Sequence, residues 1–282
     1  MRTVEQLIDS AHDVLVGAYD EHIRPQGTTL IASVVLFSGG GDSTALLDAM
    51  YSTGLVTHIG HVDTTIGIPE TRAHVDMVAD TYDLPFIVES PSEGDRFEDW
   101  IMGHGFPGPG QHFKAYQRLK ERALRKIRGQ LVTNGRTERV MFIAGRRRDE
   151  SARRSQIPVS SREGSIVWVS PIYDWTNDEI ARYRQERNLP SNPVSAHLHM
   201  SGECLCGAFA KPGELDEIAF FYPETAARIR RLEVAVAESG APPERCKWGW
   251  GADRKTPTDD NQQAFDFGPL CSSCDWRNEA TA

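Results

Sequence analysis

The feature that most constrains this chain is a glycine turn, Ser38-Gly39-Gly40-Gly41-Asp42-Ser43-Thr44, set between two apolar stretches. An apolar run at 30–37 precedes it, and Ala45-Leu46-Leu47 follows it. This order predicts a buried strand, a tight turn and a helix. Glycines let the backbone approach an anion closely, and a helix N-terminus directs N–H groups and a positive dipole at it. The stretch therefore predicts a phosphate-binding loop, with a helix-capping turn that binds nothing as the alternative.

The rest of the pattern predicts an α/β fold with a doubly wound, mostly parallel sheet. Further strands are expected at 56–62, 84–88, 139–144 and 167–169, and helices at 3–24, 43–52, 69–82, 113–128, 176–187, 214–222 and 223–238. Strands that alternate with helices favour a parallel sheet, and ligands of such sheets bind beyond the carboxyl ends of the strands. Ser38–Thr44 and Asp63 both fall at such ends, so we expect them to share one site.

Three parts are expected along the chain: an N-terminal helix at 1–27, a nucleotide-binding α/β domain at 28–200, and a small cysteine-bearing module at 201–282 that is helical and irregular. All five cysteines lie in the module, at Cys204, Cys206, Cys246, Cys271 and Cys274. An odd number of late cysteines favours metal ligation or redox chemistry over a disulfide framework. Thiolate-rich sites select zinc or an iron–sulfur cluster, and free thiols are the simplest alternative.

Charge is unevenly distributed. The chain carries a net charge of −9, yet residues 118–154 hold 13 Lys and Arg against 4 Asp and Glu. A basic segment in an acidic chain predicts a focused anionic partner, with a nucleic-acid acceptor as one candidate and a solvated helix face as the alternative. No apolar run approaches the roughly 20 residues of a membrane span, and the N-terminus is typical of an amphipathic helix. We therefore expect a cytoplasmic protein without membrane contact.

Four segments, in one order, resemble the phosphoadenosine phosphosulfate reductase-like family of the PP-loop ATP pyrophosphatase superfamily. The loop matches SGGxDS, and Asp63–Thr71 resembles the DTG…PET segment. Gly145–Arg154 matches GxRxxESxxR, and the run from Trp175 to Cys204 is similar to the W…LP.NP…C run. Each motif is weak alone, but the shared order across residues 35–206 identifies the chain as a member of this superfamily, and the branch that transfers sulfur to DNA is the relative we consider first.

The resemblance implies roles for individual residues. It implies an adenine nucleotide, ATP or a relative, with Mg²⁺, and arginines that pair with phosphate or sulfate oxygens. The implied catalytic residues are Asp42, Lys120, Arg147 and Arg154. The implied nucleotide contacts are Ser38, Gly39, Gly40, Gly41, Asp42, Ser43, Thr44, Asp63, Thr64, Gly145, Arg147, Glu150 and Ser151. The implied ligands of a 4Fe-4S cluster, with Zn²⁺ as the alternative, are Cys204, Cys206, Cys271 and Cys274.

Three functions compete at this point. The first is adenylyl transfer with release of pyrophosphate, in sulfur transfer to a nucleic acid or a small molecule, with a sulfur donor or reductant protein as partner. The second is a sulfonucleotide reductase that releases sulfite. Because the tail after Cys274 lacks the Glu-Cys-Gly motif that such reductases carry, Cys246 is then the candidate nucleophile. The third is a module that senses a nucleotide or a cluster without turnover.

Overall fold

The central strand, β1 (Thr29–Leu36), is apolar along its length because helices cover both faces of the sheet that contains it. Successive side chains of a strand point to opposite faces. Val35 therefore joins the core under α1, α2 and α3, whereas Val34 and Leu36 join the core under α6. A computed structural model of the chain describes residues 2–150, apart from the side chain of Glu150, and residues 157–251.

The sheet has six strands in the order β3-β2-β1-β4-β6-β5. The strands other than β1 are β2 (His58–Val62), β3 (Phe86–Glu89), β4 (Glu138–Ile143), β5 (Ser160–Glu163) and β6 (Ile166–Val169). The pairings from β3 through β6 are parallel, and only β5 runs antiparallel, at one edge. This confirms the predicted doubly wound, mostly parallel sheet, although β5 itself was not predicted.

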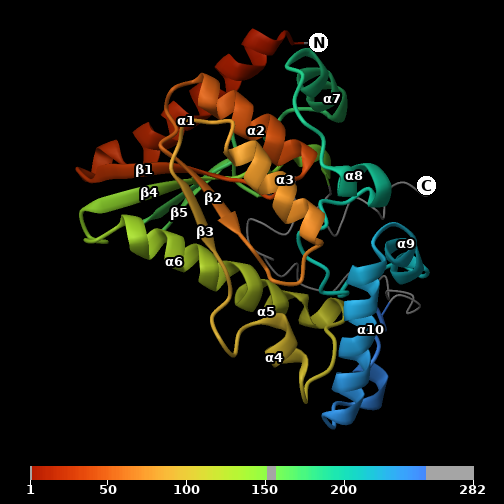
Figure 1. Ribbon diagram of the computed structural model, residues 1–282. Coiled ribbons are helices and arrows are strands. Elements are labelled where there is room, and N and C mark those ends of the chain that lie inside the picture. The colour runs from red at the N-terminus through yellow and green to blue at the C-terminus, as the bar shows by residue number, and fades with distance from the viewer. Residues whose placement is uncertain (1, 151–156, 252–282) are drawn as a thin grey trace, which may run out of the picture.

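Helices cover the two faces unequally (Figure 1). One face carries α1 (Val4–His22), α2 (Gly41–Ser52), α3 (Pro69–Ala79) and α7 (Asn177–Glu186), and the other carries α6 (Arg122–Leu131). The remaining helices are α4 (Phe97–Ile101), α5 (His112–Tyr116), α8 (Pro193–Leu198), α9 (Glu214–Phe221) and α10 (Pro223–Glu238). Short 3₁₀ turns lie at Arg24–Gln26, Pro109–Gln111, Arg148–Glu150 and Pro243–Arg245.

Two helical segments differ from the sequence prediction. The single helix expected at 113–128 is α5 and α6 joined by a π-helical turn, η3 (Gln117–Glu121). The segment at 190–202, where no helix was predicted, contains α8, because Asn192 caps the helix by accepting from Val194 N and Pro193 presets the backbone of its first turn. Periodicity alone does not reveal either feature, since both are short.

Residues 201–251 share a core with the middle of the chain. Buried side chains of Leu205, Ile218 and Trp248 pack in one cluster with Ile68 and Phe97. Figure 1 shows α10 beside α4 and α5, with α9 next to α10. The α1 helix likewise buries Leu7, Ala11, Leu15 and Ala18 in the main core. The three-part division of the chain stays a prediction, and the described parts pack against one another.

Candidate functional site

A cavity of about 510 Å³ lies at the carboxyl ends of β1, β2 and β4. Its walls come from segments far apart in the sequence: the glycine loop, β2, η3, the loop after β4, α7 and the segment after α8. From the sequence-predicted site, the lining residues are Ser38, Gly40, Gly41, Asp42, Ser43, Lys120, Gly145 and Arg147. Parallel strands bring their carboxyl ends to one edge, which is why motifs separated along the chain meet here.

The glycine loop forms the strand-to-helix turn that the sequence predicted. Gly39 has a φ of +76°, a conformation that favours glycine, and a β-carbon there would lie 2.8 Å from Val75 Cγ2. Thr44 N makes the first intrahelical bond, to Gly40 O at 3.0 Å. The N–H groups at 41–43 therefore have no acceptor within α2. A helix start of this kind suits an anion.

Two hydroxyl groups stabilise this turn from inside. Ser43 Oγ donates to Gly40 O at 2.9 Å and accepts from Ser38 N at 3.3 Å. Thr44 Oγ1 also donates to Gly40 O, at 3.0 Å. Thr44 is buried and Gly39 and Thr44 do not line the cavity, so in the described chain these two residues shape the loop rather than face the open space.

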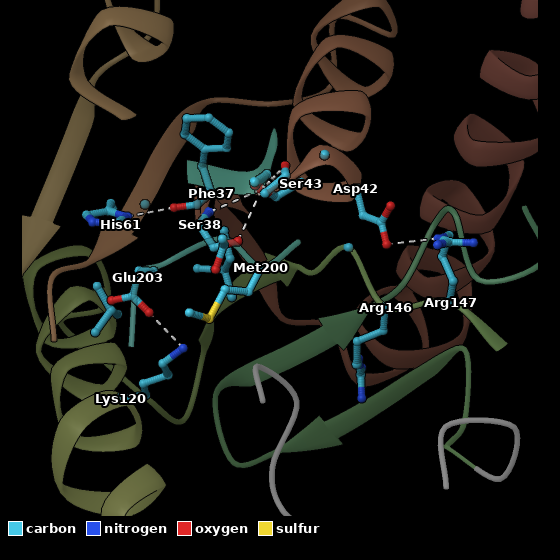
Figure 2. A pocket seen from close by; sticks show the side chains of 18 of the residues that line it. Phe37, Ser38, Asp42, Ser43, His61, Lys120, Arg146, Arg147, Met200 and Glu203 are labelled. Carbon is cyan, nitrogen blue, oxygen red and sulfur yellow. Dashed lines mark hydrogen bonds and ion pairs between the residues drawn. The ribbon is translucent and has the colours of Figure 1, made fainter. Parts of the chain in front are cut away.

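Asp42 and Arg147 form an ion pair across the cavity wall, with Arg147 Nε donating to Asp42 Oδ2 at 2.9 Å (Figure 2). The Arg147 side chain is buried, and it also donates to Trp175 O at 3.2 Å and to Asn177 Oδ1 at 2.8 Å. Arg147 thus ties the first turn of α2 to the start of α7. The pair orients the Asp42 carboxylate, and contact of this carboxylate with a nucleotide-bound Mg²⁺ stays a prediction.

Lys120 and Glu203 form a second ion pair on the other side of the loop, 2.8 Å from Nζ to Oε2 (Figure 2). Both residues are buried. Lys120 belongs to the π-helical turn η3, whose extra residue changes the face on which following side chains lie. Glu203 Oε1 also accepts from Thr64 N at 3.1 Å, so its carboxylate joins the end of β2 to the basic helix.

The Asp63–Thr71 segment holds the chain around Glu203 in place. Thr64 Oγ1 donates to Glu203 O at 2.6 Å, Ile68 N to Gly202 O at 2.8 Å, and Thr71 Oγ1 to Ser201 O at 2.5 Å. A β-carbon at Gly67 would lie 2.7 Å from Glu203 O, so only glycine allows this approach. The segment therefore acts as a backbone clamp on residues 201–203.

Asp63 and Thr64 do not line the cavity. Asp63 Oδ1 accepts from Thr65 N at 2.8 Å, an Asx turn, and Asp63 Oδ2 lies 3.6 Å from Arg72. Thr64 is fully buried by its contacts with Glu203. Thr64 therefore lies behind the wall and supports Glu203, whereas the partly exposed Asp63 side chain contacts Thr65 and Arg72. A nucleotide contact from either residue stays a prediction.

Other predicted positions lie outside the described residues or side chains. Ser151, Arg154, Cys271 and Cys274 are outside the described ranges, as is the side chain of Glu150. Their predicted roles stay predictions.

Cys204 and Cys206 lie together, directly after Glu203. The hydrogen bond with Cys206, together with burial, raises the pKa of the Cys204 thiol well above its usual value. Cys246 Sγ lies 3.4 Å from Pro242 O, and Cys246 does not line the cavity.

Within 2–150 and 157–251, no group of three or more metal-ligating side chains occurs. Two adjacent thiols fit part of a cluster site, and a full set would need Cys271 and Cys274.

Much of the basic segment is neutralised by acidic partners. Arg118 and Arg122 both pair with Asp95, Arg125 pairs with Glu121, and Lys126 lies 3.7 Å from Glu89. Because these pairs cancel much of the local charge, the segment presents a weaker positive surface than its composition predicts. A nucleic-acid acceptor stays a prediction. In the described part of the chain, no helix has the length and apolar character to cross a membrane.

His61 adds a buried neutral group to the wall. Its Nδ1 lies 2.7 Å from Phe37 O, and since a carbonyl oxygen only accepts, Nδ1 carries the proton. Burial lowers the pKa of His61, so the ring is uncharged near neutral pH.

Sequence reasoning missed several lining residues besides His61. Among the others are Asn177, Arg184, Ser195, Met200, Ser201 and Glu203. The signal that could have identified Glu203 is its position directly before Cys204, and Asn177 follows the Thr176 cap of α7.

Comparison with known proteins places these motifs within one protein domain. Residues 32–201 match the phosphoadenosine phosphosulfate reductase domain, which covers more than half of the chain. A phosphoadenosine 5'-phosphosulfate reductase of Thiocapsa roseopersicina is 26% identical over 208 residues, covering 72% of this chain and 80% of that protein. The reductase of Aliivibrio salmonicida is 26% identical over 162 residues, covering 57% of this chain and 62% of that protein.

A solved structure also matches the chain, at lower identity. The phosphoadenylyl-sulfate reductase of Candida auris, a phosphate complex, is 19% identical, with a TM-score of 0.48 over 71% of this chain and 94% of that chain. The domain match assigns the family. It includes the glycine loop, Arg147, Lys120 and the Asp63–Thr71 segment. The chain belongs to the phosphoadenosine phosphosulfate reductase domain family.

Proposed function

We propose that this chain is an adenine-nucleotide enzyme that acts on a phosphosulfate nucleotide and releases sulfite. The observation that carries the proposal is the cavity at Ser38–Ser43, where N–H groups of a helix start lie between the ion pairs Asp42–Arg147 and Lys120–Glu203. Such a site suits a dianionic phosphate or phosphosulfate group. The names of the curated relatives support this substrate class.

The reaction needs two thiols. A thiolate attacks sulfur, the S–O bond to the phosphate breaks, and a second thiol displaces sulfite as a disulfide forms. The two electrons therefore come from the thiol pair. None of Cys204, Cys206 and Cys246 lines the cavity, but Cys204 directly follows the cavity residue Glu203 in the chain and is hydrogen-bonded with Cys206. We propose the Cys204–Cys206 pair, or the dithiol of a reductant protein, as the thiol source.

A second candidate is adenylyl transfer from ATP with release of pyrophosphate, in sulfur transfer to a nucleic acid or small molecule. The SGGGDS loop favours it. Here Mg²⁺ and the cavity cations would stabilise charge on the phosphorus. This proposal includes a 4Fe-4S cluster, or Zn²⁺, bound by Cys204, Cys206, Cys271 and Cys274. A bound metal would favour the thiolate form of Cys204, whose pKa is raised in the described structure.

One set of incubations separates these functions. The purified chain is mixed with phosphoadenosine phosphosulfate or adenylyl sulfate plus a dithiol, and separately with Mg²⁺–ATP. Sulfite supports the first proposal, and AMP with pyrophosphate supports the second. Nucleotide binding without turnover supports a sensing module, and no nucleotide binding at all contradicts an adenine-nucleotide site.

A matched pair of glycine variants controls for folding. Gly39→Ala strains the loop at a φ of +76°, whereas Gly54→Ala strains a turn at +69° with open space around it. Gly39→Ala should abolish binding and turnover, while Gly54→Ala should keep both.

A further inference from the structure

Arg184 approaches the glycine loop from α7. It lines the cavity, and a β-carbon placed on Gly41 would lie 2.8 Å from Arg184 Nη1 and 3.2 Å from Arg184 Cζ. The first separation is shorter than a β-carbon contact allows, and the second is tighter than most such contacts. The guanidinium of Arg184 therefore occupies the space that a side chain at position 41 would need.

Backbone conformation does not require glycine at 41. Gly41 is the first residue of α2 and does not have a positive φ, whereas Gly39 does. Most residues are compatible with the first turn of a helix. The absence of a side chain at 41 is therefore explained by the close approach of Arg184.

Among residues 2–150 and 157–251, no carboxylate pairs with the positive charge of Arg184. Its Nη2 donates to the neutral Ser191 Oγ at 3.0 Å, and its buried Nε has no hydrogen-bond partner among the described residues. Across those same residues, no carboxylate oxygen lies within 4.0 Å of the Arg184 guanidinium. By contrast, Arg147 is matched by Asp42 and Lys120 by Glu203. Arg184 therefore adds positive charge to the N–H groups of α2, which is the arrangement an anion needs.

We propose that Arg184 binds the phosphate or phosphosulfate group of the nucleotide over the glycine loop, supplying a cation from α7. A planar guanidinium gives two parallel hydrogen bonds to such a group. This inference rests on the proposed function, because it names the residue that contacts the anionic part of the same ligand. It assigns Arg184 to the phosphate portion and not to adenosine.

Calorimetric titrations with inorganic pyrophosphate and with adenosine test this assignment on the full chain. Arg184→Ala should weaken pyrophosphate binding by about 10-fold or more, as expected for a lost charge-assisted hydrogen bond, and change adenosine binding by less than about 2-fold. Arg182→Ala removes the same charge from the same helix at a position that does not line the cavity. This control should bind both probes as the unmodified chain does.

Gly41→Ala provides an independent test that leaves Arg184 in the sequence. Because the far end of a long side chain gives way easily, this variant should fold, yet the new methyl group displaces the guanidinium. It should weaken pyrophosphate binding in the unmodified background and add little in the Arg184→Ala background, since both changes remove one contact.

These titrations distinguish failure of the Arg184 assignment from failure of the proposed function. Unchanged pyrophosphate binding in Arg184→Ala, equal loss of both probes, or additive losses with Gly41→Ala would each overturn the role of Arg184. If the unmodified chain binds neither pyrophosphate nor an adenine nucleotide, the proposed function fails instead.

Discussion

Arg147 Nε donates to Asp42 Oδ2 at 2.9 Å, and the same guanidinium donates to Trp175 O and Asn177 Oδ1. One buried side chain thus fixes the first turn of α2 relative to the start of α7. The Arg147 side chain is 6% exposed and that of Asp42 is 26% exposed. If the pair is broken, water can therefore reach the Asp42 carboxylate more easily than the Arg147 guanidinium.

Arg147→Ala should therefore destabilise the chain more than Asp42→Asn. Loss of Arg147 removes the donor of the buried bond to Trp175 O, together with the bonds to Asp42 and Asn177, at an expected cost of about 2–4 kcal/mol in the free energy of unfolding. Asp42→Asn keeps an acceptor oxygen for Arg147 and should cost about 1 kcal/mol. Urea denaturation measures both. Equal losses would show that the Asp42 contact, and not the link to α7, dominates.

Gly67→Ala should destabilise the clamp. The new β-carbon would lie 2.7 Å from a backbone oxygen, Glu203 O, which is less free to move than a side chain. An overpacking cost of about 1–3 kcal/mol is expected. Gly129→Ala, in α6 with nothing within 4 Å, is the matched control and should gain about 0.5–1 kcal/mol from helix propensity. Thermal unfolding of the two variants should give shifts of opposite sign.

Lys120 and Glu203 should be energetically coupled. Removing one partner of a buried pair costs about 3–5 kcal/mol because the other charge is left uncompensated. Lys120→Met and Glu203→Gln should each show a loss of this order. The double variant should lose less than the sum of the single losses, by at least about 1 kcal/mol. If urea denaturation shows that the stability loss of the double variant equals the sum of the two single losses, a direct interaction between Lys120 and Glu203 is contradicted.

Stability should fall as the pH decreases through the range where His61 titrates in the unfolded chain. Burial lowers the pKa of folded His61 below its ordinary value of 6.5, so the unfolded state takes up the proton first. The stabilising contribution is therefore present above about pH 6.5 and is lost as the pH falls below it.

His61→Asn tests this slope. The amide nitrogen of asparagine can replace Nδ1 in the bond to Phe37 O without titrating. Urea midpoints at pH 7.5 and pH 5.5 should differ less in this variant than in the unmodified chain. The slope should flatten without disappearing, because burial also lowers the pKa of His58 and His74. Parallel slopes would show that His61 does not titrate as inferred.

The glycine loop was predictable because strand, turn and helix are neighbours in the sequence, and the periodicity of each is local. The parallel sheet followed from the alternation of such units, and α7 was predictable from its capping box, which the structure confirms at Thr176 and Glu179. These features depend on residues a few positions apart.

The wall around Glu203 was not predictable in the same way. Thr64 and Glu203 are 139 positions apart, and only the folded chain brings them together. Asp63 was placed correctly at a strand end, but its side chain closes an Asx turn with Thr65 instead of facing the cavity. The direction of a side chain in a turn depends on local hydrogen bonds, and the residue type alone does not determine which of these bonds form.

Asn192 gives this site an order of assembly. Its Nδ2 donates to Gly39 O at 3.1 Å and lies 3.1 Å from Ser201 O, although Gly39 precedes it by 153 positions. During synthesis at about 5–20 residues per second, the glycine loop leaves the ribosome roughly 8–30 seconds before the amide that holds it. A nascent chain that stops short of Asn192 therefore carries the loop sequence without the contact that fixes its carbonyl, and ligand capture during translation must wait for the later segment.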